Sequence, residues 1–256
     1  SLGNLDAKIG TSDIKGQVSV KLAGVKRPTV NADLSSSLLD LDSLLPKQSG
    51  AEKPAAATEK KDKVFPSDPL PLDGLKAADA TFKYKAQRIT TGVIPVENLN
   101  LSLALSNGRL EIKSLKADIS GGKIDGKITA DSSRPALGLS VNLNADKIDY
   151  GALLKDLKLT DIATGKVDAK IDIKGNGASV AALMAGLNGK TRIVTEGGKI
   201  ESGVLNVVSS DIMAALPFVD SKGDKEIRCG VIDFDIRKGQ ANAKSLVFKT
   251  GGLSMI

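Results

Sequence analysis

The side chains that most often carry out catalysis are scarce in this sequence. It contains no histidine, which removes the commonest general base and the commonest transition-metal ligand. Cys229 is the single cysteine, so neither an intrachain disulfide nor a cysteine-based zinc site can form. A small, buried, apolar role is the simplest interpretation of this thiol. We therefore expect no bound metal and no cofactor.

Acidic pairs and glycine-rich turns are the remaining candidates for chemistry. Asp40 and Asp42, like Asp233 and Asp235, lie two residues apart on strand sides that we expect to face solvent. The glycine-rich turn at 175–177 lacks the lysine and hydroxyl residue that follow in a phosphate-binding P-loop. No serine has a histidine partner, and no G-x-S-x-G elbow occurs. These observations predict a protein that is not an enzyme.

What the sequence offers instead is a long series of one-sided strands. Apolar residues at 167, 169, 171 and 173 alternate with charged ones, which is the period of a strand with one apolar face. The same alternation is uninterrupted from Leu137 to Leu143. Asn107-Gly108 between two such runs is a strong hairpin signal. In all we expect about eleven strands of this kind.

Two segments have helical periodicity. Between residues 178 and 188, apolar side chains recur at helical spacing, with Ser179 as the expected N-cap and Gly189 as the expected C-terminal glycine. A second apolar stripe runs from 203 to 217 and ends at Pro217. Together with the flanking strands, the first helix forms a strand, helix, strand unit over 163–200.

The sequence around the first helix carries a family resemblance. The run GNGASVAALMAGLNGK at 175–190, then a strand, EGGKIESG and an apolar helix, resembles the C-terminal region of the AsmA family, in the wider group of AsmA/TamB-like envelope proteins. The run CGVIDFDIRKGQANAKSLVF at 229–248 resembles the paired strands that follow there. The resemblance covers most of the chain after about residue 70. It implies a protein of the Gram-negative envelope that is anchored to the inner membrane and projects a lipid-handling β-groove into the periplasm.

Composition divides the chain into three parts. Residues 1–45 are expected to form a first β segment that ends in an apolar Leu-Leu turn. Residues 46–71 contain five prolines and an Ala/Glu/Lys-rich middle, which predicts a disordered linker or loop. Residues 72–256 form the AsmA-like β region. The chain starts without an initiator Met and stops where the family would continue with another strand, so we expect a fragment of a longer protein.

The number of strands limits the possible architectures. Two short helices cannot cover the apolar faces of about eleven strands, so the sheet must close, pair with a second sheet, or fold over as a trough. The residues alone favour a closed sandwich or barrel. The resemblance favours an elongated, twisted antiparallel sheet folded into a trough with an apolar inner face. An outer-membrane barrel is disfavoured because aromatic girdles are missing.

A trough of this kind would suit acyl chains. We expect it to hold a phospholipid or another acyl-chain lipid as part of a bridge between the inner and outer membranes. The alternative is a non-catalytic scaffold or outer-membrane assembly factor with a dry β core. The side chains that we expect to line the lipid groove are Leu101, Leu103, Leu105, Ile112, Ile124, Ile128, Leu137, Leu139, Val141, Leu143, Val167, Ile171, Ile173, Ile232, Phe234 and Ile236.

The charge pattern and the aromatic content limit the classes of binding partner that we expect. The formal net charge is +6, but the lysines are spread along strands as the polar partners in the alternation, which is typical of a solvated sheet face. Aromatic residues make up 3% of the chain and tryptophan is absent, which argues against single-stranded nucleic-acid platforms. We expect membrane and envelope-protein partners and no nucleic acid.

Overall fold

The structure is a computed structural model that describes residues 2–22, 27–44, 65–157, 163–200, 225–250 and 254–255. Within these ranges, thirteen strands form one sheet in which every strand lies beside its neighbours in the sequence. The strands are β1 (Leu2–Ile9), β2 (Ser12–Lys21), β3 (Thr29–Asp40), β4 (Asp79–Thr90), β5 (Val96–Ser106), β6 (Arg109–Ile119), β7 (Gly122–Asp131), β8 (Leu137–Asp149), β9 (Ala163–Gly177), β10 (Asn188–Ile200), β11 (Lys225–Arg237), β12 (Gln240–Thr250) and β13 (Ser254–Met255). The helices are α1 (Leu41–Leu44), α2 (Asp73–Ala77), α3 (Tyr150–Asp156) and α4 (Val180–Ala185).

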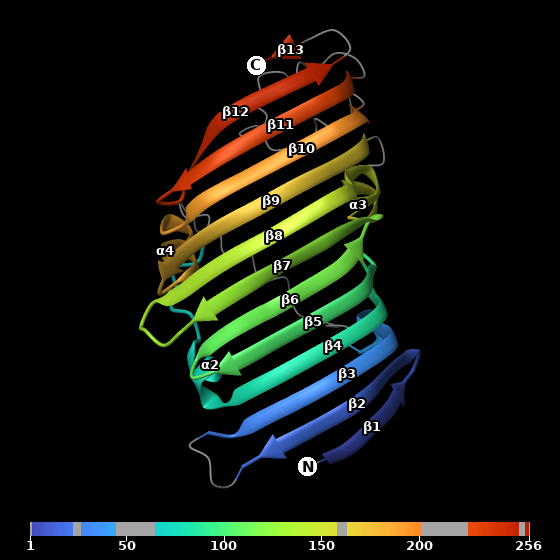
Figure 1. Cartoon of the computed structure of the whole chain (residues 1–256), viewed down its shortest axis with the longest axis vertical. Helices are drawn as coiled ribbons and strands as arrows, with labels where there is room; N and C mark the ends of the chain where they lie inside the picture. The colour runs from blue at the N-terminus through green and yellow to red at the C-terminus, as the bar shows by residue number, and fades with distance from the viewer. Residues whose placement is uncertain are drawn as a thin grey trace, which may run out of the picture.

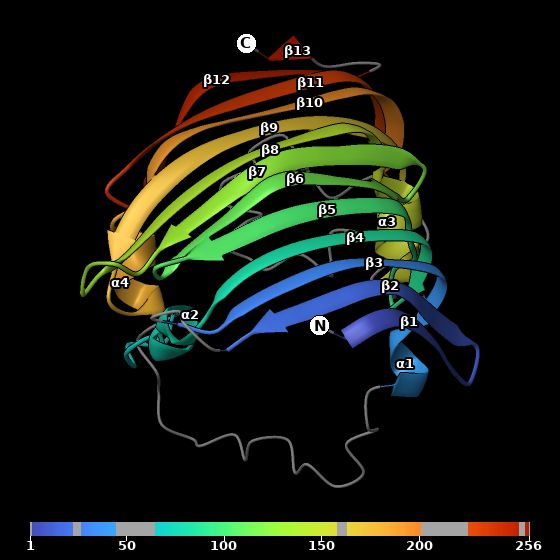
Figure 2. The same ribbon diagram turned by 60° about the horizontal axis from the view of Figure 1, so that its bottom comes forward.

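The sheet is an open, curved trough. Figure 1 shows the strands stacked side by side along the long axis, with the two ends of the sheet far apart. Figure 2 shows that the strands arch, and that the short helices lie at the ends of the strands on the inner side of the arch. We call the concave side the inner face and the convex side the outer face. The predicted trough is confirmed.

Two-residue turns make four of the connections between the described strands, those of β1 to β2, β5 to β6, β6 to β7 and β11 to β12. Asn107 and Gly108 both have positive φ, 51° and 79°, as a type I′ hairpin turn requires. The turns at 120–121 and 238–239 likewise pair a positive-φ residue with a positive-φ glycine. The hairpin predicted at Asn107-Gly108 is therefore confirmed, as the turn between β5 and β6.

One strand pair departs from the uniformly antiparallel sheet that we expected. β3 and β4 are parallel, with Thr29 opposite Asp79 and Asp40 opposite Thr90. A parallel pair cannot be joined by a tight hairpin, so its connection must run from one end of the pair to the other. Helix α1 follows the end of β3 and helix α2 precedes the start of β4, at opposite ends of the pair.

The first predicted helix is confirmed and the second lies outside the described residues. Helix α4 falls within 178–188, and the Ser179 hydroxyl caps it by accepting a hydrogen bond from the amide of Ala182 at 3.1 Å. Its C-cap is Gly186, whereas Gly189, which was expected to end the helix, belongs to β10. The stripe at 203–217 is not described.

Helix α3, which follows β8 directly, was not among the two helices predicted from the sequence. It spans Tyr150–Asp156, and the Asp149 carboxylate accepts a hydrogen bond from the amide of Ala152 at 2.9 Å. The Tyr150 ring lies against Gly165 and Gly198, where any Cβ atom would overlap the ring. Two glycines on adjacent strands therefore allow α3 to contact the sheet.

The described part of the predicted linker contacts the start of α4, between β9 and β10. The amide of Leu70 donates to the carbonyl of Ala178 at 2.9 Å, and the amide of Ala181 donates to the carbonyl of Pro66 at 2.9 Å. The segment 65–77 therefore extends from α4 to the start of β4. Residues 46–64 lie outside the described part of the chain.

Candidate functional site

The inner face carries continuous cross-strand rows of apolar side chains. The register places one residue from each of ten strands in a single row, and its members are mostly Leu, Ile and aromatic. A second row lies two residues away on the same strands, or three residues away on β6, where the register shifts. The first row is Leu34, Tyr84, Leu101, Leu115, Gly126, Leu143, Ile171, Thr191, Phe234 and Ala243; the second is Ala32, Phe82, Leu103, Ile112, Ile128, Val141, Ile173, Gly189, Ile236 and Ala241.

All sixteen residues predicted to line a groove lie on this one face. The register pairs and the alternation of each strand place them there, and every one is half-buried. They are Leu101, Leu103, Leu105, Ile112, Ile124, Ile128, Leu137, Leu139, Val141, Leu143, Val167, Ile171, Ile173, Ile232, Phe234 and Ile236. The structure brings them together as a surface; whether that surface holds lipid remains a prediction.

Helix α4 shows which side of the strands faces the inside of the trough. Gly175 belongs to the same side of β9 as Ile173, and a Cβ atom there would lie 3.0 Å from Leu187 Cδ2 and 3.2 Å from the Leu183 carbonyl oxygen. The apolar side of β9 therefore faces α4, which lies under the arch (Figure 2). The apolar rows line the concave side of the trough.

Full burial of apolar side chains is rare along these rows. The core cluster consists of Tyr84, Ala86 and Ile89 on β4, and it lies against partly buried residues of β3, α1 and β5. Elsewhere among the described residues, only Ala117, Ile148, Leu187 and Ile227 are buried apolar residues, and none is a predicted groove residue. The rows from β5 to β12 thus form a half-exposed apolar surface.

Small and polar residues interrupt the rows at β10. Gly189 lies between Ile173 and Ile236, and Thr191 lies between Ile171 and Phe234. Sequence reasoning missed this interruption, although its signal was present, because the stretch from 188 to 192 has no large apolar residue at the inner-facing positions. The inner face is therefore not uniformly apolar along its length.

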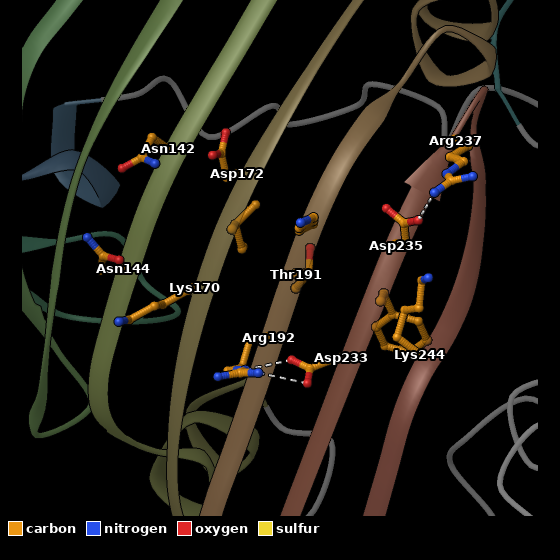
Figure 3. Close-up of a pocket in the computed structure, with 13 residues that line it drawn as sticks. Asn142, Asn144, Lys170, Asp172, Thr191, Arg192, Asp233, Asp235, Arg237 and Lys244 are labelled. Atoms are coloured by element: carbon orange, nitrogen blue, oxygen red, sulfur yellow. Dashed lines mark hydrogen bonds and ion pairs between the residues drawn. The ribbon is translucent and has the colours of Figure 1, made fainter.

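The outer face carries a charged hollow that sequence reasoning also missed. It has a volume of about 660 Å³ and lies across β8 to β12, where Figure 3 shows its polar side chains. The residues that alternate with the inner-facing ones supply most of its lining. Its charged members are Lys170, Asp172, Lys190, Arg192, Asp233, Asp235, Arg237 and Lys244, and the amide side chains of Asn142 and Asn144 complete its polar lining.

Two arginine–aspartate pairs lie in this hollow. Arg192 donates to Asp233 through Nε at 2.6 Å and through Nη2 at 2.9 Å, from adjacent strands (Figure 3). The hydrogen bond with Arg192 lowers the pKa of Asp233, and the same bond raises the pKa of Arg192. Arg237 pairs with Asp235 on the same strand at 2.8 Å. Asp233 and Asp235 are therefore paired on a solvent-facing surface, where simple solvation had been expected.

Asp40 also departs from simple solvation. Its carboxylate accepts hydrogen bonds from the hydroxyl of Thr90 at 3.2 Å and from Ser43, and the Ser43 hydroxyl is the largest cause of its lowered pKa. This network ties the end of β3 to α1 and β4. Its role is structural, because it lies at the end of the β3–β4 pair.

The described residues contain no cluster of three or more potential metal-ligating side chains. None of their helices combines the length and the apolar character needed to cross a membrane.

Comparison with known proteins agrees with the sheet architecture and the sequence pattern. The model of the AsmA family matches residues 3–246, which is nearly the whole chain. The chain belongs to the AsmA family. The AsmA family protein YhjG of Escherichia coli (strain K12) is 27% identical over 264 residues, covering 96% of this chain and 38% of that protein. This AsmA-family chain therefore spans less than two-fifths of the length of that relative. No solved structure matches it.

Membership confirms the resemblance and extends it. The sequence pattern suggested AsmA-like character after about residue 70, whereas the family match begins at residue 3 and includes the first three strands. The parallel pairing of β3 with β4 explains how both parts belong to one sheet. Membership in the AsmA family associates the chain with the cell envelope.

Proposed function

We propose that the inner face of this AsmA-family sheet holds the acyl chains of a phospholipid or similar lipid, without chemical transformation. The observation that carries the proposal is the pair of apolar rows that cross ten strands and are half-exposed from β5 to β12. Monomeric soluble proteins rarely leave a large contiguous apolar surface uncovered unless it binds something. An open apolar trough therefore favours a lipid-binding function over the alternative, a scaffold whose β core is fully packed.

The dimensions and energetics suit a lipid. Strands about 4.8 Å apart give ten-strand rows a length of roughly 43 Å. That length exceeds the roughly 15 Å that one leaflet contributes to the hydrocarbon core of a bilayer. Burial contributes about 0.8 kcal/mol per methylene, so half-covering a chain of about sixteen carbons contributes roughly 6 kcal/mol. The rows can therefore bind acyl chains at several positions along the trough.

Family membership supports the proposed setting. We place the trough in the periplasm, in a longer protein anchored to the inner membrane, where it would form part of a bridge toward the outer membrane. The aliphatic character of the rows supports movement along such a bridge, because Leu, Ile and Val positions differ little in their affinity for a methylene. The lipid headgroup would remain in water at the open side of the trough.

The direct test places two charges on the inner face of β8, one of them in the second apolar row. Leu139→Asp with Val141→Asp introduces two carboxylates there, and Ser140→Asp introduces one on the outer face of the same strand, outside the charged hollow. Native mass spectrometry of the purified proteins should show co-purifying lipid on the parent chain and on Ser140→Asp. We expect at least a tenfold loss on the double variant, provided that its thermal unfolding resembles that of the control. Equal lipid on all three proteins would overturn the proposal.

A further inference from the structure

We propose that the charged hollow on the outer face of β8–β12 binds a phosphate group, at a site separate from the acyl-chain face. The hollow contains five cationic and three acidic side chains, an excess of two positive charges. A phosphate mono- or diester carries the complementary charge. The amide side chains of Asn142 and Asn144 add hydrogen-bond donors beside the cations.

The two arginines do not account for the excess, because each already has a carboxylate partner. Arg192 pairs with Asp233 and Arg237 pairs with Asp235. In the part of the chain that the structure describes, Lys170, Lys190 and Lys244 form no ion pair, and Asp172 is the one acidic lining residue left beside them. The hollow thus offers three ammonium groups to an anion, of which Lys190 lies opposite Asp172 on one neighbouring strand and Asp235 on the other.

The strand register keeps two cations in an unfavourable arrangement. Lys170 on β9 lies directly opposite Arg192 on β10. Like charges that face each other across a strand pair destabilise a sheet. An anion bound beside Lys170 would offset this repulsion, whereas Arg192 already has Asp233 as its partner. Locally unfavourable arrangements such as two facing like charges are expected at binding sites.

A bulge in the β11–β12 pair contributes the third lysine. Asp233 pairs with Ser245 and Phe234 pairs with Ala243, so Lys244 is the extra residue that has no opposite partner. A bulge re-aims the side chain that it carries and is common beside functional sites. Figure 3 shows Lys244 over β11 and β12, on the side of the hollow away from Asn144.

A second hollow on the sheet serves as an internal comparison. It has a volume of about 420 Å³ and is lined by residues of β1 to β4. Its charged lining residues are Asp33 and Lys83, which balance, and the rest of its lining is neutral. The cation excess is therefore a property of the β8–β12 hollow and does not follow from the polar character of a strand surface.

The test measures phosphate binding to the intact chain. Titration with inorganic phosphate and with glycerol 3-phosphate, followed through backbone amide shifts in NMR spectra, should move the resonances of Lys170, Arg192 and Lys244. The triple variant Lys170→Gln/Lys190→Gln/Lys244→Gln should bind at least tenfold more weakly. Lys83→Gln in the second hollow should leave binding unchanged. These exposed substitutions keep the strand backbone intact, which thermal unfolding would verify.

A second arm identifies the source of the phosphate. Flotation with vesicles of phosphatidylglycerol should retain the parent chain and lose the triple variant if a lipid headgroup occupies the hollow. Binding of the soluble phosphates without vesicle retention would assign the hollow to a free phosphate compound, and either pattern supports the site. Absence of both, or an equal loss in Lys83→Gln, would overturn the proposal. Neither arm depends on acyl chains in the trough, so the two proposals can fail separately.

Discussion

The hydroxyl of Tyr84 on β4 donates a hydrogen bond to the hydroxyl of Ser36 on β3, at an oxygen–oxygen distance of 2.9 Å. Both residues are buried, with 7% and 5% of their surface exposed. The bond crosses the parallel β3–β4 pair, where the first three strands join the rest of the sheet. It therefore lies at the junction on which the continuity of the trough depends.

Removal of this hydroxyl should weaken the junction. Tyr84→Phe leaves the buried Ser36 hydroxyl without its partner, and we expect the free energy of unfolding to fall by about 1–2 kcal/mol. Urea denaturation at neutral pH measures the change. The double variant Tyr84→Phe/Ser36→Ala should recover part of the loss, since it removes both polar groups. A double variant that loses the full sum of the two single changes would contradict this account.

Acid should destabilise the sheet through carboxylates that accept backbone or side-chain hydrogen bonds. The amides of Leu38 and Ser37 donate to Asp13 and lower its pKa below the ordinary 3.8. A carboxyl group whose folded-state pKa is depressed stabilises the fold above its unfolded-state pKa, and this stabilisation disappears as pH falls through the folded-state value. We expect the free energy of unfolding to decline below about pH 4.

The variant Asp13→Asn measures how much of the acid-induced loss in the free energy of unfolding comes from the hydrogen bonds between Asp13 on β2 and the amides of β3. Its free energy of unfolding should be lower than that of the parent chain at pH 7 and should change less between pH 5 and pH 2. Urea denaturation across that range gives both slopes. Identical slopes in the two proteins would show that the hydrogen bonds to Asp13 do not contribute to the acid response.

Two glycines on neighbouring strands should respond differently to alanine. A Cβ atom on Gly177 would lie 2.1 Å from the backbone nitrogen of Leu183, so α4 would have to move away from β9. A Cβ atom on Gly138 would meet Asp131 at 3.8 Å, an ordinary contact. We expect Gly177→Ala to cost about 1–3 kcal/mol of stability and Gly138→Ala to cost less than 1 kcal/mol. A similar cost at both positions, measured by thermal unfolding, would rule out close packing of α4 as the cause.

The alternation of apolar and polar residues was sufficient to predict which side chains share a face. Because a shift of one residue reverses every side chain in a strand, Leu137 to Leu143 could be assigned to one side without knowledge of their neighbours. The turn at Asn107-Gly108 was predictable for a local reason, since its positive φ values suit those residue types.

Features that depend on register or on long connections could not be predicted. The parallel β3–β4 pair depends on where the connection after Asp40 returns to the sheet, and its composition does not specify this. The outer hollow requires knowledge that Lys170 faces Arg192 and that Lys244 is a bulge residue. In the sequence alone these lysines are indistinguishable from the other solvated lysines. Helix α3 was also not predicted, although its N-cap, Asp149, is a residue type that favours this position.

Site-specific photo-crosslinking tests the central claim most directly. A photoreactive amino acid placed at Leu103, Ile128 or Val141 lies in the second apolar row, and one placed at Ser102, Lys127 or Ser140 lies on the adjacent outer-facing position, outside the charged hollow. After exposure to phospholipid vesicles, we predict lipid adducts at the three row positions and not at the three outer-facing positions. Equal adduct yields on the two faces, or none at the row positions, would contradict an acyl-chain trough on the inner face.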